Sequence, residues 1–149
     1  MNGGGATEKL AVYANVLISA VIRGKAFRIM ARLKETRFIT TDVNIEEVRR
    51  SLTHIAQKRG LDLDLLLDAV DALPVERFAE PAYRAKIAEA KKRMAERDPT
   101  DADLLALALT EGVPIWSQDK DFEVSGVELY TTERLLKESS HPSYLPGDA

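Results

Sequence analysis

Acidic side chains gather at three of four crossings between predicted elements of this 149-residue sequence: after the strand at 38–40, in the turn before the helix at 101–112, and after the strand at 113–117. If those strands are parallel, their carboxyl ends share one sheet edge, where such sheets bind ligands. Carboxylates gathered at one edge repel one another unless a divalent cation or bound protons neutralise them. The pattern therefore indicates a cation site. The acids are Asp42, Glu46, Glu47, Asp98, Asp101, Asp103, Asp119 and Asp121.

The same acids have a structural explanation. Carboxylates at helix starts accept hydrogen bonds from free backbone N–H groups and interact favourably with the helix dipole. Capping therefore explains any single acid as well as metal binding does. Their repetition at one predicted edge favours a site, and Asn15 and Ser19 follow the first strand at the same edge.

Composition limits the chemistry of such a site. The chain has no cysteine, which excludes thiolate ligands and disulfides. Its two histidines, His54 and His141, lie at no metal-ligand spacing, which disfavours imidazole-bound zinc and Ser-His catalysis. Oxygen ligands suit hard cations, so the expected metal is Mg²⁺ or Mn²⁺.

Short apolar runs alternate with amphipathic segments and would position these acids. The spacing predicts strands at 10–13, 38–40, 74–78, 113–117 and 126–130. It predicts helices at 16–33, 42–60, 62–73, 80–96, 101–112 and 131–139. Gly24 is a weak point in the first helix, Thr41 or Asp42 can cap the second, and Thr100 with Asp103 resembles a capping box.

This order of elements predicts an α/β fold. We expect a three-layer sandwich with a mostly parallel central sheet of four or five strands flanked by helices. Residues 1–8 are expected to be a flexible leader, 9–138 one domain and 139–149 an irregular tail. The first ten residues lack the apolar core of a signal peptide, and no apolar run approaches the roughly 18 residues of a membrane span. We therefore expect no membrane partner and a cytoplasmic location.

Four stretches between about Leu10 and Lys137 resemble the PIN-domain family. NVLISAVIRG is similar to the segment that follows the family's first Asp, and IEEVRRSL to its second motif. DPTDADLLALAL and WSQDKDF are similar to the third and fourth motifs. The most similar subgroup is the VapC-like toxins of bacterial toxin–antitoxin pairs. The resemblance implies a PIN-like fold, Mg²⁺- or Mn²⁺-dependent endoribonuclease activity on RNA, an antitoxin partner and a homodimer.

The resemblance also assigns roles to individual acids. Glu47 matches the family's second acid, and its neighbour Glu46 is the fallback. Asp101 matches the third acid better than Asp98 does. These assignments imply that Glu47 and Asp101 are catalytic metal ligands.

The fourth motif adds one further ligand and two bracing residues. Asp119 matches the fourth acid, with Asp121 as an accessory ligand. Asn15 and Ser117 match polar positions that hold such acids in place through hydrogen bonds.

The sequence departs from the family at its opening motif. The family pattern is Asp, a small residue, Asn, Val and Leu, and Tyr13 stands where the Asp is expected. The alternative is that two residues, the Asp among them, are missing before Asn15. Either way the first carboxylate is absent, and an inward-pointing Tyr13 ring could fill the metal pocket. We therefore predict nuclease activity that is strongly reduced or absent.

Several basic residues could bind RNA phosphates. Arg23, Lys25 and Arg28 lie near the first helix and Lys120 lies among the acids, but a solvated helix face explains them better given the net charge of −3. Trp116 lies in an apolar strand, which favours core packing over base stacking. The apolar helix at 62–73 could close the core or form an interface.

Two other functions compete with the nuclease. One is a non-catalytic PIN-like module that binds RNA or a protein partner, which an encoded Tyr13 favours. The other is a phosphatase-like or nucleotide-binding α/β protein, which the lack of a glycine-rich phosphate loop disfavours.

Overall fold

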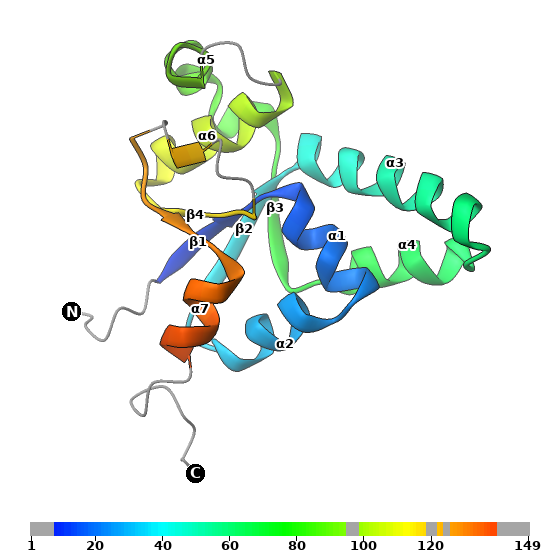
Figure 1. Ribbon diagram of the computed structural model, residues 1–149. Helices are drawn as coiled ribbons and strands as arrows, with labels where there is room; N and C mark the ends of the chain where they lie inside the picture. Colours follow the sequence, from blue (N-terminus) through cyan, green and yellow to red (C-terminus); the bar gives the residue numbers. More distant parts are fainter. Residues whose placement is uncertain (1–7, 95–98, 119–121, 124–125, 140–149) are drawn as a thin grey trace.

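The computed structural model describes residues 8–94, 99–118, 122–123 and 126–139 (Figure 1). Five strands and seven α-helices lie along these residues. The strands are β1 (Lys9–Val12), β2 (Arg37–Thr41), β3 (Val75–Phe78), β4 (Ile115–Trp116) and β5 (Leu129–Tyr130). The helices are α1 (Ala14–Ile22), α2 (Lys25–Arg32), α3 (Asp42–Arg59), α4 (Leu63–Ala72), α5 (Ile87–Met94), α6 (Pro99–Glu111) and α7 (Thr132–Ser139), with 3₁₀ turns η1 (Glu80–Ala82) and η2 (Arg84–Lys86).

The strands form one parallel sheet in the order β3-β2-β1-β4-β5. Ala11 of the central strand β1 lies opposite Ile39 of β2 on one side and Ile115 of β4 on the other. Strand order reverses between β1 and β4, so the crevice at their carboxyl ends is where this topology places a ligand. The predicted α/β fold is confirmed, and the sheet is wholly parallel.

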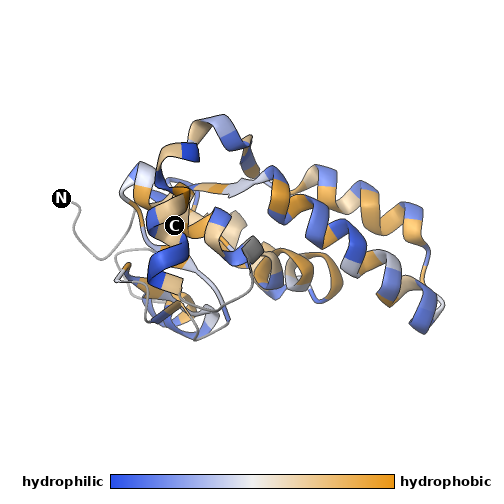
Figure 2. Ribbon diagram, turned by 90° about the horizontal axis from the view of Figure 1, so that it is seen from above, coloured by the Kyte–Doolittle hydropathy of each residue, from blue (hydrophilic) through white to orange (hydrophobic). Residues whose placement is uncertain are grey.

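Helices cover both faces of the sheet. Figure 1 shows α5 and α6 above the sheet and α1, α2 and α7 below it. Residues Leu104–Ala108 of α6 are all buried because this helix packs against β1 and β2 on one side and α5 on the other. Helices α3 and α4 pack side by side and project away from the sheet (Figures 1 and 2).

The single helix predicted for residues 16–33 is wrong. The structure has two helices, α1 and α2, separated at Gly24, whose φ of +81° lies in the left-handed region that glycine adopts readily. The break lets α2 leave the direction of α1, so that Ala26, Ile29 and Met30 are buried in the core.

The continuous helix predicted for residues 80–96 is also wrong. Two 3₁₀ turns come first, and α5 covers only Ile87–Met94; residues 95 and 96 lie outside the described part. Tyr83 separates the two turns with a non-helical φ of −132°, and its ring is almost wholly buried. The predicted capping box is wrong as well, because α6 begins at Pro99 and Thr100 therefore lies inside the helix.

The other predicted elements are confirmed with small shifts of their ends. Thr41 caps α3, because its side chain accepts a hydrogen bond from the Asn44 backbone N–H, and Gly60 ends that helix at a φ of +66°. Trp116 packs in the core beside Phe38, as predicted. None of the helices in the described ranges is long and apolar enough to cross a bilayer. The predicted leader, domain and tail limits and the cytoplasmic location stay predictions.

Candidate active site at the carboxyl edge of the sheet

A hydrogen-bonded polar group joins the carboxyl ends of β1 and β2. The Thr40 hydroxyl donates to the backbone carbonyl of Val12 over 2.9 Å, and the Asn44 side-chain amide donates to that hydroxyl over 3.2 Å. Thr40, Thr41 and Asn44 are all fully buried. Sequence reasoning missed Thr40 and Asn44, because polar residues at the start of a helix are commonly explained by capping. These bonds fix the position of the first turn of α3, the helix that carries Glu46 and Glu47.

Tyr13 and Asp101 meet at the end of the central strand. Tyr13 directly follows β1, and its hydroxyl donates a hydrogen bond to the Asp101 carboxylate in the first turn of α6. Both side chains are buried, with 7% of Tyr13 and 3% of Asp101 exposed. The Tyr13 ring also packs edge-on against Phe122, with 5.1 Å between ring centroids. Tyr13 therefore binds directly to Asp101, one of the acids predicted to hold a metal ion.

A second tyrosine binds the next acid of the same helix. The Tyr83 hydroxyl donates to Oδ2 of Asp103 over 2.6 Å. Burial, this hydrogen bond and the nearby charges of Asp103, Glu80 and Asp42 raise the pKa of Tyr83 above its usual value of 10.0. Tyr83 therefore remains a neutral donor at physiological pH. Sequence reasoning missed this residue, because its ring fits the apolar stripe expected of the predicted helix.

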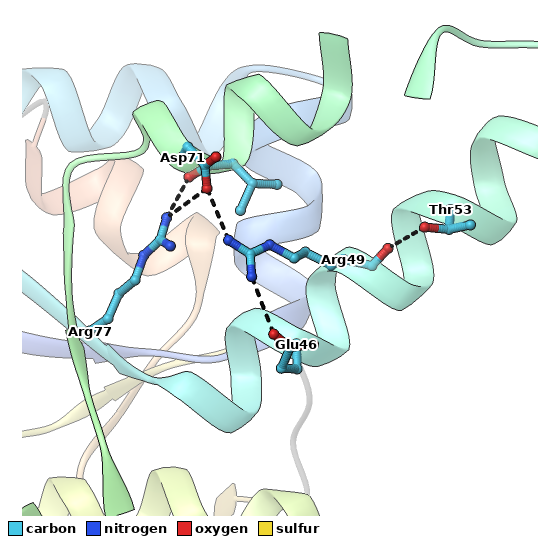
Figure 3. A network of polar contacts seen from close by, with 6 residues as sticks. Glu46, Arg49, Thr53, Asp71 and Arg77 are labelled. Carbon is cyan, nitrogen blue, oxygen red and sulfur yellow. Dashed lines mark hydrogen bonds and ion pairs between the residues drawn. The ribbon is translucent and has the colours of Figure 1, made fainter. Parts of the chain in front are cut away.

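The neighbours Glu46 and Glu47 have different surroundings. Glu46 forms an ion pair with Arg49 over 3.2 Å, and Arg49 and Arg77 both contact Asp71 (Figure 3). This network holds the exposed Glu46 at the interface of α3, α4 and β3. Glu47 is half-buried, and among the described residues its buried Oε1 has no hydrogen-bond partner. Of the two, Glu47 is thus the acid with an oxygen that a cation could use.

The predicted bracing residues lie at the β1–β4 crevice. Oδ1 of Asn15 accepts a hydrogen bond from the Gln118 backbone N–H over 3.3 Å. The backbone N–H of the fully buried Ser117 donates to the Tyr130 carbonyl over 3.0 Å. Asn15 thereby links the start of α1 to the segment that follows β4, and the bracing of the acids by Asn15 and Ser117 stays a prediction.

The remaining predicted site residues fall into two groups. Asp98, Asp119, Lys120 and Asp121 lie outside the described residues. Arg23 and Lys25, predicted to bind RNA, lie at the far end of α1 from Asn15. A nine-residue helix is about 13 Å long. These two cations are therefore about one helix length away from the acidic edge.

The described residues fit only part of a metal centre. Glu47 offers a buried oxygen without a partner, which suits a cation. At the β1 position, however, the site has a phenol in place of a carboxylate, and its proton already binds Asp101. Within the described ranges, no three acidic or histidine side chains are grouped so that they could hold a metal ion. With Tyr13 in place, these residues do not form a full divalent-cation site.

Comparison with known proteins agrees with this architecture. A family model described as a PIN domain matches residues 11–140, most of the chain. No curated protein sequence matches the chain.

Several solved structures have a similar fold. The chain aligns with VapBC2 from Rickettsia felis, bound to a promoter DNA fragment, at a TM-score of 0.62 and 12% identity over 83% of this chain and 98% of the other. It aligns with FitAcB from Neisseria gonorrhoeae at a TM-score of 0.55 and 17% identity, with the same coverage. It aligns with FitAB bound to an IR36 DNA fragment at a TM-score of 0.51 and 18% identity, over 83% of this chain and 94% of the other. At these low sequence identities, the comparison shows a shared fold and nothing more.

Proposed function

The chain belongs to the PIN-domain family, and we propose that it is a toxin-type member whose RNA-cleaving site is attenuated by Tyr13. One observation carries this proposal: the Tyr13 hydroxyl binds the buried Asp101 carboxylate, where the family motif has its first acid. Tyr13 would weaken the site in two ways. It supplies no carboxylate, and its hydroxyl directs a proton to an oxygen of Asp101 that a metal ion would otherwise contact.

The remaining acids would still serve a weakened metal centre. Glu47, Asp101 and Asp119 would hold Mg²⁺ or Mn²⁺, with Asp121 as an accessory ligand. When bound, such a cation lowers the pKa of a water molecule and neutralises charge on the phosphate. Asn15 and Ser117 would keep the acids oriented. Changes in residues that only support ligands reduce metal affinity or activity by about 10–100-fold, so the loss of a direct ligand is expected to reduce it at least as much.

The proposed biological setting is a toxin–antitoxin pair, with a partner antitoxin and RNA as the substrate. The VapC-like motifs support it, as does the fold shared with the VapBC2 and FitAB complexes. Arg23, Lys25 and Lys120 remain candidates for binding RNA phosphates. Because Arg23 and Lys25 lie away from the acidic edge, they would contact RNA only beyond the cleaved bond.

Cleavage of a mixed single-stranded RNA with Mn²⁺ tests this function. We expect the unaltered chain to cleave weakly or not at all, and Tyr13→Asp to cleave at least about 10-fold faster. Adding Asp119→Asn to Tyr13→Asp should abolish the gain. Tyr13→Phe is the matched control, because it removes the hydroxyl without supplying a carboxylate. Equal rates for the unaltered chain and Tyr13→Asp would contradict the proposal.

The second candidate function is a non-catalytic PIN module that binds RNA or a protein. The Tyr13–Asp101 contact favours it too, since the pair satisfies a buried carboxylate without any cation. Under this alternative no variant cleaves RNA, and Tyr13→Asp only destabilises the fold.

A further inference from the structure

The buried amide of Asn44, in the first turn of α3, has an unsatisfied oxygen. Asn44 is fully buried, and its Oδ1 has no hydrogen-bond partner within the described residues. The Thr40 hydroxyl determines which way the amide faces. It donates its only proton to the Val12 carbonyl over 2.9 Å, so it can only accept from Asn44, and Nδ2 therefore faces it at 3.2 Å. Oδ1 consequently faces away from Thr40.

Glu47 has the same feature three residues further along α3. Its Oε1 is buried and, in the part of the chain that the structure describes, accepts no hydrogen bond. Residues three apart on a helix share a face, with about 5–6 Å between their Cβ atoms. Asn44 and Glu47 therefore place two buried acceptor oxygens on one face of α3. Because an amide oxygen and a carboxylate oxygen both accept hydrogen bonds, neither can satisfy the other.

A single water molecule has the properties that this pair of oxygens requires. A buried acceptor without a donor costs free energy, and buried waters lie where such polar groups need a partner. One water carries two donor protons. Two hydrogen bonds of about 2.8 Å from its oxygen reach acceptors about 5 Å apart, which suits side chains three residues apart on a helix. The cationic side chain that follows on α3, Arg49, is already engaged with Glu46 and Asp71 (Figure 3).

We propose that one water molecule bridges Oδ1 of Asn44 and Oε1 of Glu47, and that Asn44 thereby positions Glu47 at the acidic edge. Thr40 and Asn44 already form hydrogen bonds back to the Val12 carbonyl at the end of β1. The water extends this chain to Glu47, so the carboxylate keeps a fixed position relative to the central strand, while its Oε2 stays available to a cation. The benefit to metal binding rests on the proposed function, whereas the water itself does not.

Nuclear magnetic resonance of the unaltered full chain tests the bridge. In ¹⁵N-labelled protein with EDTA, the Nδ2 protons of Asn44 should show a nuclear Overhauser contact with a long-lived bound water. Glu47→Met removes the second acceptor and should abolish that contact. The absence of a bound water in the unaltered chain, or an equally strong contact in Glu47→Met, would overturn the bridge.

Calorimetric titration with Mn²⁺ in the Tyr13→Asp background tests the positioning role. Asn44→Leu has a similar shape but lacks Oδ1, and it should lower the Mn²⁺ affinity by about 10–100-fold. Thr40→Val removes the same Asn44–Thr40 bond but leaves Oδ1, so it should lower the stability to urea and change the affinity much less. Thr53→Val is the matched control, since Thr53 is exposed on the same helix, and it should leave the affinity unchanged.

Three results separate the positioning role from its alternatives. Equal Mn²⁺ affinities with and without Asn44→Leu would overturn it. An equal loss of affinity in Thr40→Val would also overturn it, because Asn44 would then act only through the fold. If Tyr13→Asp binds no Mn²⁺, the proposed function fails, and the water contact of the unaltered chain alone decides the inference. Circular dichroism checks the fold of every variant, and Asn44→Ala replaces Asn44→Leu if that variant does not fold.

Discussion

At the residue scale, Tyr13 and Asp101 lie 88 positions apart in the chain and meet at the carboxyl edge of the sheet. The motifs indicated that a carboxylate was missing at Tyr13 and that Asp101 was a site residue. They did not indicate that the two side chains bind each other, because that contact depends on how α6 packs against β1. Tyr83 and Asp103 could not be paired from the sequence for the same reason.

Removing the Tyr13 hydroxyl should destabilise the protein. Tyr13→Phe leaves the buried Asp101 carboxylate with one donor fewer, which is expected to lower the free energy of unfolding by about 1–3 kcal/mol. Urea denaturation of the two chains measures the difference. In a double-mutant cycle with Asp101→Asn, the combined loss should be smaller than the sum of the single losses. Additive losses would show that the two side chains do not interact.

Tyr83 should make stability depend on alkaline pH. Its pKa is raised in the folded chain, so above about pH 10 the unfolded chain loses the phenol proton while the folded chain keeps it. The stabilisation is therefore complete below pH 10 and is lost as the pH rises further. Urea denaturation from pH 8 to 11 should show a steeper loss for the unaltered chain than for Tyr83→Phe. Identical slopes would contradict the raised pKa.

At the element scale, the sequence predicted the elements whose apolar pattern alone determines them. The β1, β2 and β4 runs are buried strands, and α3 begins at its Thr41 cap and ends at Gly60. The errors came where a local pattern was compatible with a helix but tertiary contacts required another conformation. Gly24 turns the chain between α1 and α2, and Tyr83 interrupts the predicted helix so that its ring is buried.

The left-handed conformation of Gly24 gives a prediction for the α1–α2 break. Gly24→Ala should lower the free energy of unfolding by about 1–2 kcal/mol, because a φ of +81° strains a residue with a Cβ atom. The cause is backbone strain rather than collision, since the atom nearest to an alanine Cβ at this position, Nη1 of Arg28, would be 3.8 Å away. Gly24→Asn is the control and should lower the free energy of unfolding less, because asparagine adopts the left-handed conformation more readily than alanine. Equal losses for both variants in urea denaturation would contradict this explanation.

At the scale of the whole molecule, the fold brings acids from separate helices to one edge of the sheet. The residues that form hydrogen bonds with them come from distant parts of the chain. Parallel strands made this arrangement predictable, because their carboxyl ends must share an edge. The family resemblance favours Glu47 over Glu46, but the sequence did not predict the ion-pair network with α4 and β3 that engages Glu46 (Figure 3).

Calorimetric titration with Mn²⁺ tests most directly whether Tyr13 takes the place of a metal-binding carboxylate. The unaltered chain and Tyr13→Asp are compared at the same pH, with Tyr13→Phe as the control that lacks both hydroxyl and carboxylate. Tyr13→Asp is expected to bind Mn²⁺ at least about 10-fold more tightly than either. Equal affinities for the unaltered chain and Tyr13→Asp would show that Tyr13 does not determine metal binding at this edge.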